Sequence, residues 1–193
     1  MEARILLAAV AITAAPLPLN AQTNVAVPQF EKIELRGGGT VRVRHGAQQR
    51  VTLIKGSTQY TSFDVVRSGG NGGADQLVIR ACNEQCPQRY DLEIEVVTPD
   101  VDGLAIKGGG SIDVVEGFPR QSALAAAIHG GGQIDARALP ASSVAAAVNG
   151  GGSLMVRPAS SLAAAVRGGG LIRYWGNPSV TQTVQGGGSI QRQ

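Results

Sequence analysis

One motif occurs five times between Leu104 and Gln193, and it constrains the fold of this chain more than any other feature. Each copy consists of an apolar stretch, three glycines and a second, shorter apolar stretch. The glycine triplets begin at Gly108, Gly130, Gly150, Gly168 and Gly186, so successive repeats are 18 to 22 residues long. A fixed motif with a period near 20 residues is typical of a solenoid, in which each repeat stacks on the next.

The apolar residues around each triplet share one alternation. They lie two residues before the first glycine and four and six residues after it, and all of these positions have the same parity. Before the triplet they are Ile106, Ile128, Val148, Val166 and Val184, and after it they are Ile112, Ile134, Leu154, Ile172, Ile190, Val114, Ala136, Val156 and Tyr174. Residues of one parity point to one face of a β-strand. Each repeat is therefore predicted to hold two short strands with an inward apolar row, joined by a sharp bend at the glycines.

Each connection between repeats contains a proline, which cannot donate to a sheet ladder and is therefore predicted to mark a turn. These prolines are Pro119, Pro140, Pro158 and Pro178. Two strands, a glycine corner and a proline turn make one coil of a right-handed parallel β-helix, a single-stranded solenoid. A helical reading of the alanine-rich segments is disfavoured because six residues between glycine triplets are too few for a helix, which needs about 12 or more.

The first half of the chain is predicted to be rich in strands but less regular. Alternating segments occur around Gly37–Gly39 and at residues 50–55, 63–67, 76–81 and 91–97. The last repeat is more polar than the others and carries Gln182 where they carry alanine or leucine, as expected of a terminal cap. We expect one all-β domain over residues 22–193, with regular coils over 104–193.

Residues 1–21 have the pattern of a secretory signal peptide. Arg4 precedes an apolar run from Ile5 to Ala15, which is followed by Pro16, Pro18 and the small residue Ala21. The run is shorter than the roughly 20 residues of a spanning helix. We therefore expect an exported protein, located in the periplasm, at the cell surface or outside the cell, without a transmembrane span in the mature chain. The net charge of +3 is mild, and no nucleic-acid partner is predicted.

The two cysteines, Cys82 and Cys86, lie at the tip of an apparent hairpin between residues 76–81 and 90–97. In an exported protein such a pair is predicted to form a disulfide. Metal binding is the weaker alternative, because His45 and His129 lie far away in the sequence. The glycine-rich loop Ser68–Asp75 is only a weak candidate for phosphate binding, since no helix is expected after it.

The opening FEKIELRGGGTVRV, the junction YDLEIEVVTPDVDGLAIKGGGSIDV and the glycine repeats together resemble the putative auto-transporter adhesin, head GIN domain family. The resemblance extends from about Phe30 to Ile190. It implies a β-helical surface protein of unknown molecular function, with no catalytic residue and no cofactor to carry over. The chain departs from the family in its full glycine triplets, where the family more often has Gly-Ser-Gly, and in its alanine-rich strands.

Stacking of the repeats would turn equivalent positions into columns, and two polar columns are candidate sites. The residues directly before the triplets are predicted to form an outward, mildly basic stripe suited to anionic glycans or lipid headgroups, or else an ordinary solvated face. They are Arg36, Lys107, His129, Asn149, Arg167 and Gln185. Asp113 and Asp135 occupy one position in adjacent repeats, where two carboxylates could share a proton or bind a cation. No further acid joins them, so no metal site is predicted.

Outward alanines recur in three consecutive repeats, and they are predicted to form a flat face. They are Ala125, Ala127, Ala145, Ala147, Ala163 and Ala165. Such an apolar face would be an interface, covered either by a second copy of the protein or by the chain's own first half. Tyr174 and Trp175 lie at a coil edge, where they are expected to cap the core or, less favourably, to stack on a sugar ring.

These features predict an exported, non-enzymatic protein with a structural, adhesive or cell-envelope-associated role. Its partner would be a second copy, an envelope component or a glycan. The alternative is a glycan-binding or glycan-cleaving solenoid with Asp113 and Asp135 as its acids. No Ser-His-Asp or Cys-His arrangement is evident, so no catalytic residue and no cofactor is predicted.

Overall fold

The computed structural model describes residues 22–67, 75–82, 85–115 and 117–193, so the predicted signal peptide and most of the loop from Ser68 lie outside the described residues. The described residues form fifteen β-strands in one sheet, with no helix among them. The prediction of an all-β fold is confirmed.

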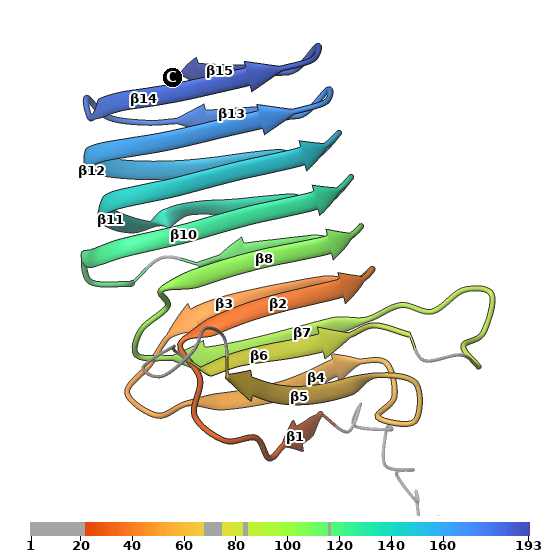
Figure 1. The fold of residues 1–193 in the computed structure, drawn as a ribbon. Helices are drawn as coiled ribbons and strands as arrows, with labels where there is room; N and C mark the ends of the chain where they lie inside the picture. The colour runs from red at the N-terminus through yellow and green to blue at the C-terminus, as the bar shows by residue number, and fades with distance from the viewer. Residues whose placement is uncertain (1–21, 68–74, 83–84, 116) are drawn as a thin grey trace, which may run out of the picture.

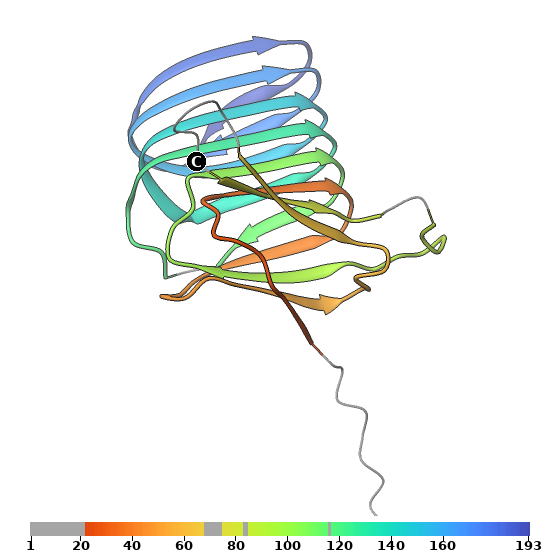
Figure 2. The ribbon, with the colours of Figure 1, turned by 60° about the horizontal axis from the view of Figure 1, so that its bottom comes forward.

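The strands lie in two rows with a shared core between them (Figures 1 and 2). The first row contains, in spatial order, β5 (Ser62–Arg67), β6 (Asp75–Arg80), β2 (Lys32–Gly37), β8 (Gly103–Gly108), β10 (Gln121–Gly130) and β14 (Ser179–Gln185). The second row contains β1 (Thr23–Val25), β4 (Arg50–Lys55), β7 (Glu93–Thr98), β3 (Thr40–His45), β9 (Ser111–Val114), β13 (Leu171–Tyr174) and β15 (Ser189–Arg192). Two long strands, β11 (Gln133–Gly150) and β12 (Ser153–Arg167), begin in the second row and continue into the first.

Equivalent positions of the repeats pair directly with one another. In the first row Ile128 of β10 pairs with Ile106 of β8 and with Val148 of β11, and in the second row Ile134 pairs with Ile112 and Leu154. All of these pairings are parallel, so each repeat lies on the preceding one at the ordinary strand spacing of about 4.8 Å. One repeat of 18 to 22 residues is therefore the length of chain that completes one layer and reaches the equivalent position in the next layer.

The predicted inward alternation is confirmed in the interior of the stack and fails at its C-terminal end. Ile106, Ile128, Ile134 and Leu154 are each 0% exposed. Val184 of the last coil is 42% exposed, because β14 pairs with β12 on one side and with no described strand on the other. The last coil therefore covers the layer beneath it and leaves its own inward row partly open.

The spatial order of the first half differs from its order in the sequence. The coil of β2 and β3 lies between β8–β9 and β6–β7, although β4 and β5 separate it from β6 and β7 in the chain. Beyond them, β4 and β5 pair antiparallel with β7 and β6. The less regular N-terminal half therefore continues the same two rows, and the strands of one of its layers, β4 and β5, run antiparallel to their neighbours.

The predicted hairpin around the cysteines is wrong. β6 pairs with β2 and β5 in the first row, and β7 pairs with β3 and β4 in the second, so the two strands are not partners. The segment between β6 and β7 leads the chain from the first row to the second, as a glycine triplet does in the repeats. At the start of this segment, the Ala81 amide donates a hydrogen bond to the Arg36 carbonyl of β2. The predicted disulfide is present within this segment, with the Cα atoms of Cys82 and Cys86 5.8 Å apart.

Two of the four prolines do not interrupt the strands as predicted. Pro119 and Pro178 lie outside strands, whereas Pro140 lies inside β11 and Pro158 inside β12. The pairing between β11 and β12 shifts register between Ala136 and Ala141, at the bend from one row to the other. A shifted ladder leaves backbone groups unpaired, so a residue without an N–H is tolerated there and the strand continues around the bend.

Candidate functional site

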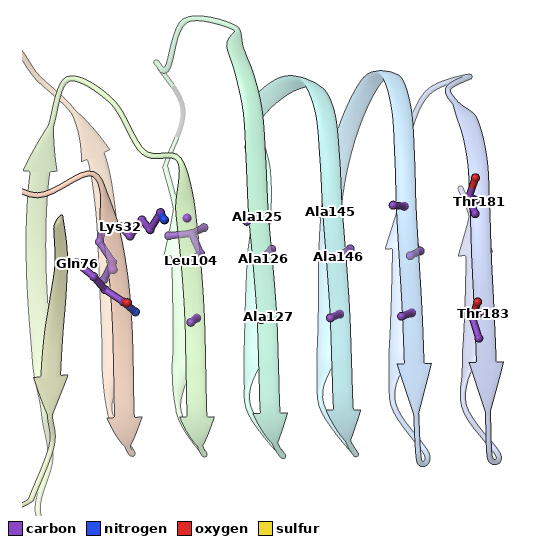
Figure 3. A pocket seen from close by; sticks show the side chains of 17 residues that line it. Lys32, Gln76, Leu104, Ala125, Ala126, Ala127, Ala145, Ala146, Thr181 and Thr183 are labelled. Atoms are coloured by element: carbon purple, nitrogen blue, oxygen red, sulfur yellow. The ribbon is translucent and has the colours of Figure 1, made fainter. Parts of the chain in front are cut away.

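The outward alanines form the floor of an open groove on the first row (Figure 3). Ala125, Ala145 and Ala163 stand in register on three adjacent strands, and each is exposed. The groove measures about 570 Å³, and it extends from Lys32 and Gln76 at one end to Thr181 and Thr183 at the other. Methyl groups make up most of its floor, because no longer side chain arises from these positions.

The described part of the first half does not cover this groove. Ala125, Ala145 and Ala163 would be buried if the N-terminal strands packed on them, yet all three are exposed. The N-terminal strands instead extend the two rows beyond β8 (Figure 1). The predicted alternative in which the chain's own first half covers the alanines is therefore wrong for the residues that the structure describes.

The predicted polar stripe is a single column in the structure, beside the alanine groove. Its members pair in register along the first row, and Arg80 of β6 extends the column by one layer. In spatial order they are Arg80, Arg36, Lys107, His129, Asn149, Arg167 and Gln185. The Asn149 amide lies 3.3 Å from the His129 ring. The two halves of the column differ, because Arg80, Arg36 and Lys107 in the N-terminal half form ion pairs with acidic side chains.

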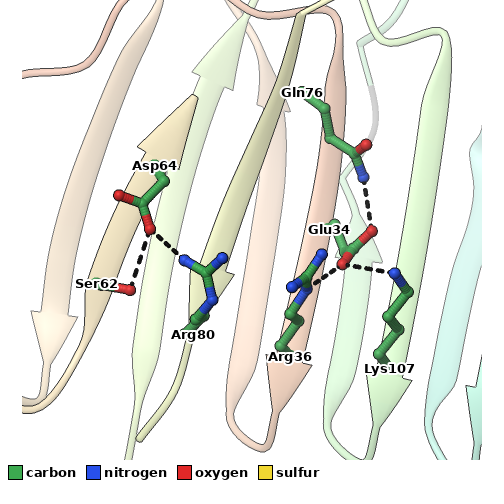
Figure 4. Close-up of polar contacts among 7 residues, drawn as sticks. All are labelled: Glu34, Arg36, Ser62, Asp64, Gln76, Arg80 and Lys107. Carbon is green, nitrogen blue, oxygen red and sulfur yellow. Dashed lines mark hydrogen bonds and ion pairs between the residues drawn. The ribbon is translucent and has the colours of Figure 1, made fainter. Parts of the chain in front are cut away.

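Glu34 is the acid that holds the first two predicted stripe residues (Figure 4). It is only 5% exposed, it points outward from β2, and it pairs in register with Ala105 at the end of the alanine groove. Its carboxylate accepts hydrogen bonds from Arg36 and, at 2.9 Å, from the Gln76 amide, and the Lys107 ammonium lies 3.3 Å away. Burial raises the pKa of Glu34, but the hydrogen bonds and charges of Arg36 and Lys107 outweigh this and lower the pKa below its ordinary value of 4.5. This cluster was not predicted from the sequence, although an acid within the apolar segment KIEL was a visible signal.

Glu34→Gln is expected to reduce the free energy of unfolding by about 1–3 kcal/mol at pH 7, because a charge-assisted network loses its anion. The effect should depend on pH. Since the pKa of Glu34 is lower in the folded state, its contribution is present above the unfolded pKa and is lost as pH falls through the folded value. Urea denaturation between pH 7 and pH 3 tests this: the difference between wild type and variant should shrink toward acid pH.

A difference that stays constant over that range would contradict the assigned role of the Glu34 charge. Asp64→Asn serves as the matched control, because Asp64 also accepts from an arginine, Arg80, but is about half exposed. Exposed ion pairs contribute about 0–1 kcal/mol, so this variant should change stability little at any pH.

The two aspartates of the predicted acid pair do occupy adjacent positions. Asp113 of β9 pairs in register with Asp135 of β11. Arg137, however, binds Asp135 with both ends of its guanidinium, with Nε 2.9 Å from Oδ1 and Nη2 2.6 Å from Oδ2. Burial raises the pKa of Asp135, yet the bonds and charge of Arg137 prevail and lower it. A shared proton would require a raised pKa, so this geometry favours a structural ion pair over an acid–base pair.

A second concavity lies on the outer face of the second row, next to this ion pair. It measures about 660 Å³, and its lining includes Arg137, Arg157, Trp175, Phe118 and Pro140. The Arg137 guanidinium lies over the Trp175 ring, 5.2 Å from its centroid. The prediction that aromatic residues cap the core holds for Tyr174, which packs against it, while Trp175 faces this concavity. The sequence did contain a signal for this concavity, namely the residues seven positions after the first glycine of each triplet. They include Val115, Arg137, Arg157 and Trp175.

Two further properties bear on the kind of site this chain can offer. Within the described ranges, no group of three or more His, Cys, Asp or Glu side chains is arranged to hold a metal ion. No helix in the same part of the chain is both long and apolar enough to cross a membrane.

The repeats match a known protein family. Residues 120–178 match the sequence model of the family described as "Putative auto-transporter adhesin, head GIN domain". This match confirms the resemblance noted in the sequence, and it falls on the regular coils. No curated protein matches the chain.

Several solved structures align with most of the chain. A putative adhesin from Bacteroides fragilis is 17% identical, with 90% of this chain and 96% of the other covered and a TM-score of 0.48. A putative adhesin from Parabacteroides distasonis is 13% identical, with 90% and 96% covered and a TM-score of 0.45. A putative cell adhesion protein from Clostridium sporogenes is 9% identical, with 89% and 97% covered and a TM-score of 0.41.

Proposed function

We propose that this protein is an exported, non-enzymatic contact module with an adhesive or cell-envelope-associated role, and that the alanine groove is its main contact surface. The observation that supports the proposal is the groove itself, because exposed alanines recur in register on adjacent strands. Alanine is a poor strand former, and exposed strand positions usually carry larger or polar residues. A floor of methyl groups lets a partner surface approach the backbone closely, and the candidate partners are a second copy of the protein and a component of the cell envelope.

We also propose that the repeats form a right-handed parallel β-helix, in which the chain winds once per repeat. Parallel strands one repeat apart support this description, and connections between parallel strands are right-handed in about 98% of cases. The resemblance to the adhesin head family supports the adhesive role, and the predicted signal peptide at residues 1–21 supports export.

Ala145→Arg tests the proposed surface. Ala145 lies in the centre of the groove and is exposed, so an arginine there should leave the free energy of unfolding within about 0.5 kcal/mol of wild type. At a contact face it should lower the oligomer mass measured by light scattering, or reduce retention of the protein on envelope fragments. Gln133→Arg places the same charge on an exposed position of the second row and should change neither quantity.

Two results would contradict parts of this proposal. If Ala145→Arg alters neither mass nor retention, the groove is open to solvent and is not the contact surface. If the protein turns over a polysaccharide and this activity is lost in Asp113→Asn, the protein is an enzyme, which is the competing prediction from the sequence.

A further inference from the structure

We propose that the concavity on the outer face of the second row binds an acidic saccharide, meaning a sugar ring that carries a carboxylate or sulfate group. No residue that lines the alanine groove on the first row also lines this concavity, which lies on the second row. The inference therefore goes beyond the contact function proposed above and does not depend on it.

The repeat brings the binding side chains together. Ala136, Val156 and Tyr174 pair in register on successive strands of the second row. The residues that directly follow them, Arg137, Arg157 and Trp175, all line the concavity. Because inward and outward positions alternate, the buried row of Ala136 and Val156 leaves the next residues on the outer face.

The charges of the described lining residues leave one arginine available for an anion. Asp135 and Arg137 neutralise each other through their two-point contact. Arg157 is exposed and takes part in no ion pair with the described residues. A free guanidinium has planar paired donors that match a carboxylate or a sulfate. The site therefore favours a ligand with one such group.

The remaining lining favours a ring over a small free anion. Trp175 is half-buried, and the Arg137 guanidinium on its face restrains the indole. An indole offers an apolar surface on which the C–H face of a sugar can lie. Val115 adds a further apolar wall, and at 36% exposure it is among the few large hydrophobic side chains of the described residues that are exposed to solvent.

The size of the concavity agrees with this ligand class. Its volume of about 660 Å³ lies within the range of roughly 300–1,000 Å³ that is common for small-molecule sites. A single inorganic anion would contact Arg157 and leave the indole and Val115 unused. A neutral saccharide would leave the arginine unused. An acidic saccharide uses both parts of the site.

Isothermal titration calorimetry on the full chain tests the inference with two probes, a trigalacturonate and a sulfated heparin-derived disaccharide. Maltotriose and inorganic sulfate are the reference ligands. We expect at least one acidic saccharide to bind more tightly than both references, and its affinity to fall as salt is raised. Arg157→Gln and Trp175→Ala should each weaken this binding by about tenfold or more.

Two controls separate loss of the site from loss of the fold. Arg50→Gln removes an exposed arginine from β4 that does not line the concavity, and this variant should bind as wild type. The melting midpoint of each variant is measured alongside, and Trp175→Phe, which keeps an aromatic ring, should recover part of the affinity lost in Trp175→Ala. Ala145→Arg should leave saccharide binding intact, so failure of the groove proposal and failure of this one are distinguishable.

Three results would overturn the inference. They are that neither acidic saccharide binds, that maltotriose or inorganic sulfate binds equally well, or that folded Arg157→Gln and Trp175→Ala variants retain wild-type affinity. The two probes also separate the possible acids. Both carry a uronate carboxylate, so binding of trigalacturonate assigns a carboxylate, whereas binding of the disaccharide alone assigns its sulfate groups.

Discussion

Ile134→Ala and Leu154→Ala are each expected to lower the free energy of unfolding by about 2–5 kcal/mol, through lost burial and the cavity left behind. The two residues are 0% exposed and pair with each other in adjacent layers of the second row. Every coil above and below rests on this layer, so the cavity cannot close by a local shift. Urea denaturation followed by circular dichroism measures the effect.

The neighbouring outward residues provide the controls for this test. Gln133 and Ser153 precede Ile134 and Leu154 on the same strands and lie on the outer face, where Gln133 is exposed and Ser153 is partly exposed. Their replacement by alanine should change the free energy of unfolding by no more than about 0.5 kcal/mol. If all four variants had the same stability, the assignment of inward and outward positions would be rejected.

Gly150→Ala is expected to destabilise the protein by a comparable amount. Gly150 opens a glycine corner with a φ of +125°, a conformation that costs other residues about 1–3 kcal/mol. A Cβ at this position would also overlap the Gly130 carbonyl of the layer below, and such overpacking costs about 1–3 kcal/mol. The combined loss of about 2–6 kcal/mol should be evident in the urea midpoint and in the melting temperature.

The middle glycine of the same triplet is the matched control. A Cβ built on Gly151 meets nothing within 4 Å, and its φ is not in the left-handed region. Gly151→Ala should therefore be neutral, or stabilising by up to about 1 kcal/mol through the unfolded state. Equal effects at Gly150 and Gly151 would contradict the proposed geometry of the corner.

The two positions also explain the family pattern noted in the sequence. The third glycine, Gly152, is also restricted, because a Cβ there would lie 2.6 Å from Ile128 Cγ2 and 2.7 Å from the Gly132 oxygen. Only the middle position has room for a side chain. A Gly-Ser-Gly corner is therefore compatible with the same backbone as the full triplets of this chain.

The regular half of the molecule could be predicted because its information is local and repeated. The glycine spacing fixed which residues lie one layer apart, and the period-2 alternation fixed which side chains are inward, as Ile106, Ile134 and Leu154 demonstrate. From the same spacing one can predict that Asp113 lies beside Asp135 and that the residues of the polar stripe align in one column, as the strand register shows. When a motif recurs at a constant interval, the register of its strands follows from the interval alone.

The interactions within those columns could not be predicted in the same way. The repeat places Asp135 next to Asp113, but whether it pairs with Asp113, with a cation or with Arg137 depends on side-chain rotamers and on the solvent exposure of each group. The two-point contact with Arg137 and the position of that guanidinium over Trp175 were therefore decided by the tertiary structure. The Glu34 cluster is a further example, because Lys107 reaches it from a strand more than seventy residues away.

The sequence by itself determined that the chain is all-β, that its repeats stack at one layer per glycine triplet, and which residues of the interior repeats are buried. Only the tertiary structure decided the order of the first half, in which β2 and β3 are inserted between β6–β7 and β8–β9 and in which β4 and β5 run in reverse. The physical reason is that backbone hydrogen bonds are the same for any pair of strands, so an alternating segment without a repeat can pair with several partners in either direction. What selects among them is the packing of the whole core, and that packing exists only in the folded chain.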